Sequence, residues 1–253
     1  MSLNFEEKGI PIALINGGEY DREILYVNPD EEGEKVFKLD SGTFSLLPKF
    51  DGRFSDYYVG KAGSGKSTLC AEKAKNYHLM FPNNDIYLFS ILEADPAFDA
   101  MEKKGIIKRV VIDESLIDDP IDYNDFKNCL VIFDDVDSFH NAKIMKAINA
   151  IRDQILQLGR HNNISIINCS HNVNHTGTEA KFNRIIMNEL HNLVFFNKSA
   201  NYHQIKYCLK KYFGFSDKQI EKIIRNKDTR WTCISSNHPQ YVITQDLCVL
   251  TNC

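Results

Sequence analysis

The segment GKAGSGKS, residues 60–67, is the feature that most constrains what this chain can fold into. A glycine, four residues and then Gly-Lys-Ser form the pattern of a phosphate-binding loop. The backbone of such a loop turns tightly and directs successive N–H groups at phosphate oxygens, which side chains at Gly60, Gly63 and Gly65 would obstruct. The pattern requires a strand before the loop and a helix after it.

The sequence on either side of the loop meets that requirement. Residues 54–59, FSDYYV, have strand composition, and a helical stripe follows the loop at Leu69, Lys73, Ala74, Tyr77 and Phe81. The loop therefore predicts binding of ATP with Mg²⁺, in which Lys66 reaches the β and γ phosphates and the Ser67 hydroxyl ligates the metal. We expect these residues to bind the nucleotide: Gly60, Lys61, Ala62, Gly63, Ser64, Gly65, Lys66, Ser67 and Thr68.

The remaining pattern predicts the fold class. Apolar β-like runs begin near residues 85, 105, 128 and 164, and helical or loop material separates them. This alternation is typical of a mainly parallel central sheet flanked by helices, so we expect an α/β P-loop NTPase fold of the ASCE/RecA-like type. One of the expected helices follows residue 140 and ends at a cap, Gly159. Its apolar stripe consists of Ile144, Ile148, Ile151, Ile155 and Leu158.

Three consecutive regions are expected along the chain. Residues 1–52 form a small region rich in β-hairpins, and residues 53–200 form the P-loop ATPase core. Residues 201–253 form an extension of helices and a β-hairpin. In that extension two short helices meet at Gly214, and Ser216 caps the second.

Paired acids follow the buried run LVIF, at Asp134 and Asp135. Open α/β sheets place their ligands at the carboxyl ends of strands, so both carboxylates are expected beside the phosphate loop. Asp134 fits the carboxylate that holds Mg²⁺, together with Ser67. Asp135 stands where a base or water-positioning residue acts in many ATPases.

A further strand, ISIINCS, carries a polar end to the same edge of the sheet. His171 follows it and is expected to sense the γ phosphate, and Arg160 precedes it. Arg160 could neutralise charge on the γ phosphate, including across a subunit boundary, or it could be a surface cation that favours the end of a helix. The next candidates for such an arginine finger are Arg184 and Arg152.

Composition narrows the class of protein. The 253 residues carry a net charge of −4, 43% are hydrophobic, and no run approaches the roughly 18 apolar residues of a membrane span. The first residues, MSLNFEEKGI, lack the apolar core of a signal peptide, so we expect a cytoplasm-like compartment. Residues 201–230 hold eight basic and three acidic side chains, which could mark a nucleic-acid or acidic-partner face or an ordinary solvated helix surface.

These motifs in combination resemble the genome-packaging ATPases of poxviruses and other large DNA viruses, within the FtsK/HerA superfamily. The resemblance covers about residues 42–250 and rests on the segments GKAGSGKST, LVIFDDVD and GRHNNISII…SHN, with FSDKQIEKII, RWTCIS and QYVIT in the tail. It implies a ring-shaped homo-oligomer that drives double-stranded DNA into a capsid. Capsid or portal-like proteins would then be its partners, and it would work in the host cytoplasm, a viral factory or the virion.

The resemblance also implies roles for single residues. The family's catalytic roles carry over to Lys66, Ser67, Asp134 and Asp135, and the role of arginine finger carries over to Arg160. The sequence departs from the family at two positions, because the family often has glutamine where His171 stands and the wider superfamily tends to have glutamate at Asp135.

Other readings of the phosphate loop remain. The chain has no D-x-x-G after the loop, no N-K-x-D and no L-S-G-G-Q, which disfavours guanine-specific regulators and transporter ATPases. A P-loop small-molecule kinase and a nucleotide-binding structural or regulatory subunit both stay open. ATP hydrolysis measured with and without double-stranded DNA separates them from a motor.

Overall fold

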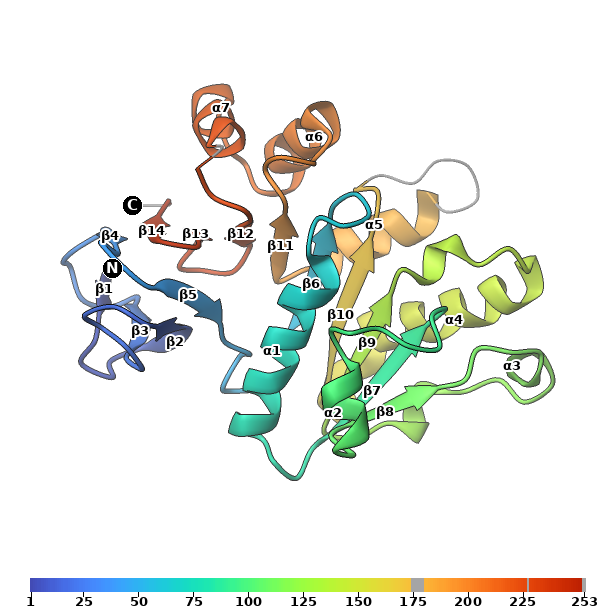
Figure 1. The fold of residues 1–253 in the computed structure, drawn as a ribbon. Coiled ribbons are helices and arrows are strands. Elements are labelled where there is room, and N and C mark those ends of the chain that lie inside the picture. Colours follow the sequence, from blue (N-terminus) through green and yellow to red (C-terminus); the bar gives the residue numbers. More distant parts are fainter. Residues whose placement is uncertain (174–179, 227, 252–253) are drawn as a thin grey trace. The chain divides into compact units, whose positions relative to one another are not determined.

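The computed structural model describes residues 1–173, 180–226 and 228–251, with the backbone alone at residues 180–183. The chain divides into two compact units. One unit is the continuous stretch Gly52–Leu190, and the other combines Met1–Asp51 with His191–Cys253. Figure 1 colours the chain from its blue N-terminus to its red C-terminus, so that the two parts of the second unit can be told apart.

Five parallel strands form the sheet of the Gly52–Leu190 unit, in the order β6-β10-β9-β7-β8. The strands are β6 (Ser55–Val59), β7 (Asp85–Ser90), β8 (Ile107–Val110), β9 (Cys129–Asp134) and β10 (Ile164–Ser170). The helices are α1 (Lys66–Met80), α2 (Asp99–Lys103), α3 (Ser115–Asp118), α4 (Ala142–Leu158) and α5 (Ala180–Glu189).

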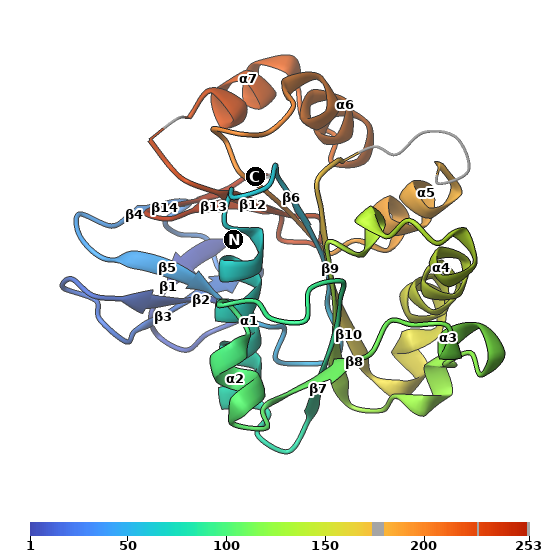
Figure 2. The same ribbon diagram turned by 45° about the vertical axis from the view of Figure 1, so that its right-hand side comes forward.

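Helices cover both faces of this sheet, which explains its apolar strands. Helices α1 and α2 lie on one face, and α3, α4 and α5 lie on the other (Figures 1 and 2). Strands β9 and β10 are buried along their whole length, as expected when a parallel sheet is covered on both sides. The α/β fold with a mainly parallel sheet is confirmed, and β10 lies between the strand of the phosphate loop, β6, and the strand of the paired acids, β9.

Helix α1 buries the stripe that the sequence indicates. Leu69, Ala74 and Tyr77 are all buried, and Lys73 is buried with them. The Lys73 Nζ donates to Asp56 Oδ2 of β6 at 2.6 Å and lies 4.5 Å from the centroid of the Phe54 ring. This buried ion pair ties the helix after the phosphate loop to the strand before it.

The end of α4 differs from expectation in two respects. Ile144 to Ile155 supply the buried stripe, but Leu158, the last residue of the helix, is 39% exposed. Gly159 does end the helix, yet its φ of −57° is not left-handed. A Cβ at this position would come within 2.8 Å of Nη1 of Arg53, so the guanidinium would have to shift to admit another residue.

The second unit holds two antiparallel sheets, with strand orders β1-β3-β2-β5 and β4-β14-β13-β12-β11. Its N-terminal strands are β1 (Ser2–Asn4), β2 (Ile10–Asn16), β3 (Ile24–Asn28), β4 (Val36–Lys38) and β5 (Thr43–Leu46). Its C-terminal elements are β11 (Asn192–Phe195), α6 (Tyr202–Tyr212), α7 (Asp217–Arg225), β12 (Thr232–Ser235), β13 (Tyr241–Thr244) and β14 (Leu247–Leu250).

Strand pairing explains why this unit is discontinuous in sequence. β4 pairs with β14, so that Lys38 lies opposite Leu247, and β11 pairs antiparallel with β12. Residues 1–51 and 191–253 therefore form one unit, where the sequence suggested separate regions 1–52, 53–200 and 201–253. Hydrogen bonds between distant segments leave no local signal in the sequence.

The helical pair of this unit follows the predicted local pattern. Gly214 between α6 and α7 has a φ of +73°. The Ser216 hydroxyl accepts from the backbone N–H of Gln219, whose side chain in turn accepts from the Ser216 N–H, which is a capping box. Nowhere in the part of the chain that the structure describes is a helix both long enough and apolar enough to span a membrane.

Candidate active site

The phosphate loop leaves β6 at Val59 and enters α1 at Lys66. The Gly60 N–H donates to the Ser170 carbonyl at 3.1 Å, which anchors the loop to the end of β10. Gly63 and Gly65 have φ angles of +72° and +104°, in the left-handed region. A Cβ on Gly63 would meet nothing within 4 Å, so its requirement for glycine is conformational and not the steric obstruction that we expected.

Lys66, Asp135 and His171 converge beyond the carboxyl ends of the strands. The Lys66 Nζ lies 3.4 Å from Asp135 Oδ1 and 3.4 Å from His171 Nδ1. The other imidazole nitrogen, Nε2, lies 3.5 Å from Asp135 Oδ2. The Lys66 side chain is only 3% exposed, so its charge acts where water screens it weakly. These three groups come from α1 and from the ends of β9 and β10, as the sequence predicts.

Ser67 and Asp134 form a second pair beside that cluster. The Ser67 hydroxyl donates to Asp134 Oδ2 at 3.0 Å. Burial raises the pKa of the Asp134 carboxyl to about 6, repulsion from Asp135 adds to the rise, and the Ser67 hydrogen bond opposes it. Asp134 Oδ1 is buried without a hydrogen-bond partner in the described structure. An unmatched carboxylate oxygen beside a hydroxyl is a donor set that fits Mg²⁺.

The segment CSHNVNH, residues 169–175, also carries Cys169, His171 and His175, which are residue types that can ligate zinc. Cys169 is buried in β10, and His175 lies outside the described residues. Among the residues that the structure describes, no group of three or more His, Cys, Asp or Glu side chains could hold a metal.

A buried arginine supports the turn that carries Asp135. Asp135 has a φ of +51° and leads into a 3₁₀ turn, Val136–Ser138. Within that turn Asp137 Oδ1 accepts from Arg152 Nη1 of α4 at 2.7 Å, and the Arg152 guanidinium lies 5.8 Å from the Phe133 ring. Arg152 is only 2% exposed and its guanidinium is paired with Asp137, which disfavours it as an arginine finger for a neighbouring subunit.

Arg160 is not brought to the site within this chain. It is exposed in the turn Gly159–Asn162, before β10 begins, whereas His171 follows the end of β10. A strand of this length spans about 20 Å at roughly 3.3 Å per residue. Within the described residues the Arg160 guanidinium has no ion pair or hydrogen bond. Arg184, the other candidate, is exposed on α5.

Two supporting residues escaped the sequence analysis. The Arg53 guanidinium donates to the carbonyls of Ile155 and Leu156 at 2.6 and 2.7 Å, so it satisfies the end of α4, a role that we had considered for Arg160. The Tyr57 hydroxyl donates to the Asn172 carbonyl at 2.6 Å and so fixes the backbone beside His171. Both act on segments about 100 residues away, which no local pattern reveals.

Comparison with known proteins relates these features to a family. No family model matches the chain. A protein of Sputnik virophage, named as uncharacterized protein V3, is 35% identical over 246 residues, which cover 96% of each chain. This chain belongs to the V3 family.

Solved structures show the same fold at low sequence identity. The DNA-packaging ATPase B204 of Sulfolobus turreted icosahedral virus matches with a TM-score of 0.51 and 15% identity, over 76% of this chain and 96% of B204. The pCW3 conjugation coupling protein TcpA matches with a TM-score of 0.50 and 10% identity, over 94% of this chain and 77% of TcpA. The type VII secretion ATPase EccC of Thermomonospora curvata matches with a TM-score of 0.51 and 12% identity, over 93% of this chain and 28% of EccC. The expected fold of the packaging ATPases is confirmed.

Proposed function

We propose that this V3-family protein is an ATP-hydrolysing motor that moves double-stranded DNA and packages a viral genome into its capsid. The observation that carries the proposal is the convergence of Lys66, Ser67, Asp134, Asp135 and His171 at one edge of the parallel sheet. The shared fold with B204, whose name describes a DNA-packaging ATPase, supports the choice of substrate.

The loop and Lys66 bind the phosphates in this mechanism. The backbone N–H groups around Gly63 and Gly65, at the start of α1, attract phosphate oxygens. Lys66 supplies a point charge to the β and γ phosphates. The phosphates would replace Asp135 as the partner of Lys66, which leaves the Asp135 carboxylate free to accept a proton.

Ser67 and Asp134 would hold Mg²⁺, the hydroxyl directly and the carboxylate directly or through water. When bound, this ion neutralises charge on the phosphates. A cation beside Asp134 also favours the ionised carboxylate over the protonated form that burial promotes.

Asp135 and His171 act on the attacking water and the γ phosphate. Asp135 accepts the proton of the water as general base. His171, within reach of both Lys66 and Asp135, senses whether the γ phosphate is present. Arg160 completes the site of a neighbouring subunit in a ring, as an arginine finger in trans.

The proposed partners follow from this assembly. They are double-stranded DNA, further copies of the chain and capsid or portal-like proteins. The motor would act where particles assemble, in the host cytoplasm or a viral factory, or remain with the virion.

The test measures phosphate release from ATP by the purified protein, with and without double-stranded DNA. Stimulation by DNA is expected for the motor. A small-molecule kinase would be indifferent to DNA, and a structural or regulatory subunit would release no phosphate, so either result rejects the proposal.

The Lys66→Ala variant is the control for this assay. It should lose tight ATP binding and turnover, because the phosphates lose their buried positive charge. Wild-type rates in a folded Lys66→Ala preparation would show that the activity does not come from this site.

A further inference from the structure

One face of α6 carries a stripe of basic and aromatic side chains. His203, Lys206, Tyr207, Lys210 and Lys211 follow the three- and four-residue spacing of a single helical face and line one hollow in the surface. The opposite face buries Ile205, Cys208 and Leu209 in the unit that holds the helix. The sequence of α6, YHQIKYCLKKY, contains no acid. This stripe therefore faces solvent with one sign of charge.

Aromatic side chains hold part of that charge in place. Tyr207 is 47% exposed, and the Lys211 Nζ donates to its hydroxyl at 2.7 Å. The same ammonium lies 5.2 Å from the ring centroids of Tyr207 and Tyr212. Contacts of a cation with two rings reduce the conformational freedom that Lys211 must lose when it meets an anion.

Asp217, at the start of α7, is the one carboxylate that pairs with this stripe in the described structure. Its Oδ1 lies 3.1 Å from the Nζ of Lys206, and its Oδ2 lies 3.1 Å from the Nζ of Lys210. Exposed pairs of this kind contribute little to stability, so both lysines can exchange Asp217 for another anion at small cost. One carboxylate between two lysines also leaves the stripe with a net positive charge.

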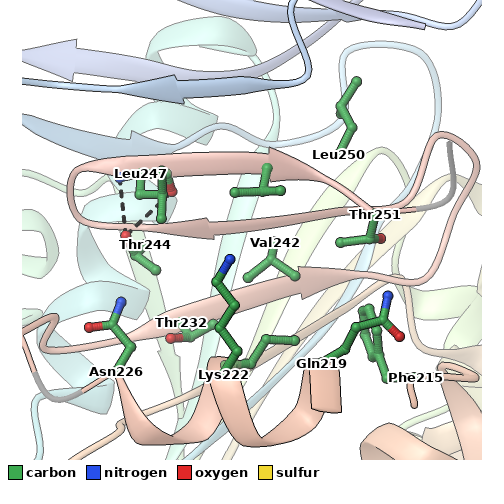
Figure 3. Close-up of a pocket in the computed structure, with 12 residues that line it drawn as sticks. Phe215, Gln219, Lys222, Asn226, Thr232, Val242, Thr244, Leu247, Leu250 and Thr251 are labelled. Carbon is green, nitrogen blue, oxygen red and sulfur yellow. Dashed lines mark hydrogen bonds between the residues drawn. The ribbon is translucent and has the colours of Figure 1, made fainter. Parts of the chain in front are cut away.

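The other helix of the pair has a different environment. Lys222 of α7 extends toward the strands across a cavity of about 240 Å³ between α7 and β12–β14 (Figure 3). Apolar side chains such as Val242 and Leu247 line much of that cavity. None of the residues that line this cavity belongs to the α6 stripe.

We propose that the α6 stripe, defined as His203, Lys206, Tyr207, Lys210 and Lys211, binds the phosphate backbone of double-stranded DNA. The proposal rests on the proposed function, and it assigns to α6 the DNA contact that the nucleotide site itself lacks. Lys206 and Lys210 are one helical turn apart, about 6 Å along the axis. Phosphates of one DNA strand recur about every 3.4 Å along the DNA axis, so two lysines at this spacing can contact phosphates of the same strand.

Backbone contacts carry no base information, so binding should depend on salt and not on sequence. The experiment measures the affinity of the full chain for two unrelated duplexes over a range of salt concentrations. In Lys206→Gln/Lys210→Gln/Lys211→Gln, affinity should fall at least about tenfold at low salt, equally for both duplexes. The slope of log affinity against log salt should become shallower by roughly 2 to 3.

A matched control removes the same charge elsewhere. Lys103→Gln/Lys104→Gln/Lys108→Gln neutralises three exposed lysines in and after α2, one of which also pairs with an aspartate, Asp85. Asp217→Asn tests the opposite direction, because it releases Lys206 and Lys210 and should tighten DNA binding. ATP hydrolysis without DNA should stay at the wild-type rate in all three variants.

The outcomes separate the two proposals. Failure of the wild type to bind any duplex would reject the DNA motor itself. If the wild type binds DNA and the α6 and α2 triple variants lose affinity equally, the α6 stripe is rejected as the DNA site. The proposed DNA motor would not be affected by that result. The α6 triple variant could instead bind DNA as the wild type does and lose its attachment to capsid protein. That result would also reject the α6 stripe as a DNA site, in favour of an acidic protein partner.

Discussion

Asp134 and Asp135 are neighbours in sequence but occupy different environments. Asp134 ends a buried strand, is 2% exposed and is bound by Ser67. Asp135 has left-handed backbone geometry, is 26% exposed and faces Lys66 and His171. Two identical side chains can therefore perform separate tasks.

Substitution of each acid by asparagine should give different kinetic defects. Asp135→Asn should retain binding of ATP with Mg²⁺ and lose turnover by on the order of 100-fold or more, because the water loses its base. Asp134→Asn should weaken the dependence of ATP binding on Mg²⁺, because the metal loses its carboxylate. Titration with a fluorescent ATP analogue at several Mg²⁺ concentrations, combined with single-turnover rates, measures both. An equal binding defect in the two variants would contradict this division of roles.

Single residues were predictable where their chemistry is written in a local pattern. Lys66 and Ser67 belong to a loop motif, and Asp134 and Asp135 follow an apolar run. Because the carboxyl ends of parallel strands lie at the same edge of a sheet, these four residues were expected to lie close together. Arg53 was not predictable, because its partners are carbonyls that every residue possesses. The roles assigned to His171 and Arg160 remain predictions.

At the scale of elements, the contact between α4 and the turn after β9 matters most. Arg152 of α4 and Asp137 of the turn form an ion pair in which the side chains are 2% and 13% exposed. A buried pair of this kind stabilises little in itself, but removal of one partner leaves the other charge without compensation.

Arg152→Ala should lower the free energy of unfolding by about 3 kcal/mol or more, since the Asp137 carboxylate would lose its ion pair with Arg152. Without this contact the turn after Asp135 should be held less firmly, so the substitution should also lower kcat more than it weakens ATP binding. Chemical denaturation and ATPase assays below the unfolding transition measure the two effects. The control Lys108→Ala removes an exposed pair with Asp85 and should leave stability unchanged. A loss of stability with unaltered kcat would mean that Arg152 does not support Asp135.

Periodicity predicted elements well where burial follows one face. The stripes of α1 and α4 were visible in the sequence, apart from the exposed end of α4 at Leu158. Strand β14 was missed, although its four residues, LCVL, alternate in burial. The structure shows that alternation, with Cys248 and Leu250 buried.

At the scale of the whole molecule, the position of Arg160 makes a subunit mixture informative. Arg160→Ala should bind ATP normally, because its own loop is intact, and turnover should fall by about 1,000-fold. Mixed with Lys66→Ala, which keeps Arg160 but lacks a working loop, it should recover part of the hydrolysis rate, since some interfaces then pair a sound loop with a sound arginine.

Recovery is measured as phosphate release against the ratio of the two variants. Formation of mixed oligomers must be verified, for example by pull-down of differently tagged subunits. Mixed oligomers without recovery would exclude Arg160 as a finger in trans, and exposed Arg184 would be the next residue to test.

The parallel sheet was predictable from the alternation of strands and helices, but the composition of the other unit was not. Helical crossovers constrain parallel neighbours, whereas the pairing of β4 with β14 joins segments about 200 residues apart. The residues of a strand do not indicate which distant strand it pairs with.

That pairing has a consequence for the growing polypeptide on the ribosome. The nucleotide unit, Gly52–Leu190, is continuous and can begin to fold as soon as it emerges. Strands β1–β5 emerge earlier, yet β4 must wait for β14, which is translated after the whole of that unit. Until then its edge is unpaired, which exposes it to association with other chains. Nascent chains stalled after residue 190 should therefore bind nucleotide while they still recruit chaperones.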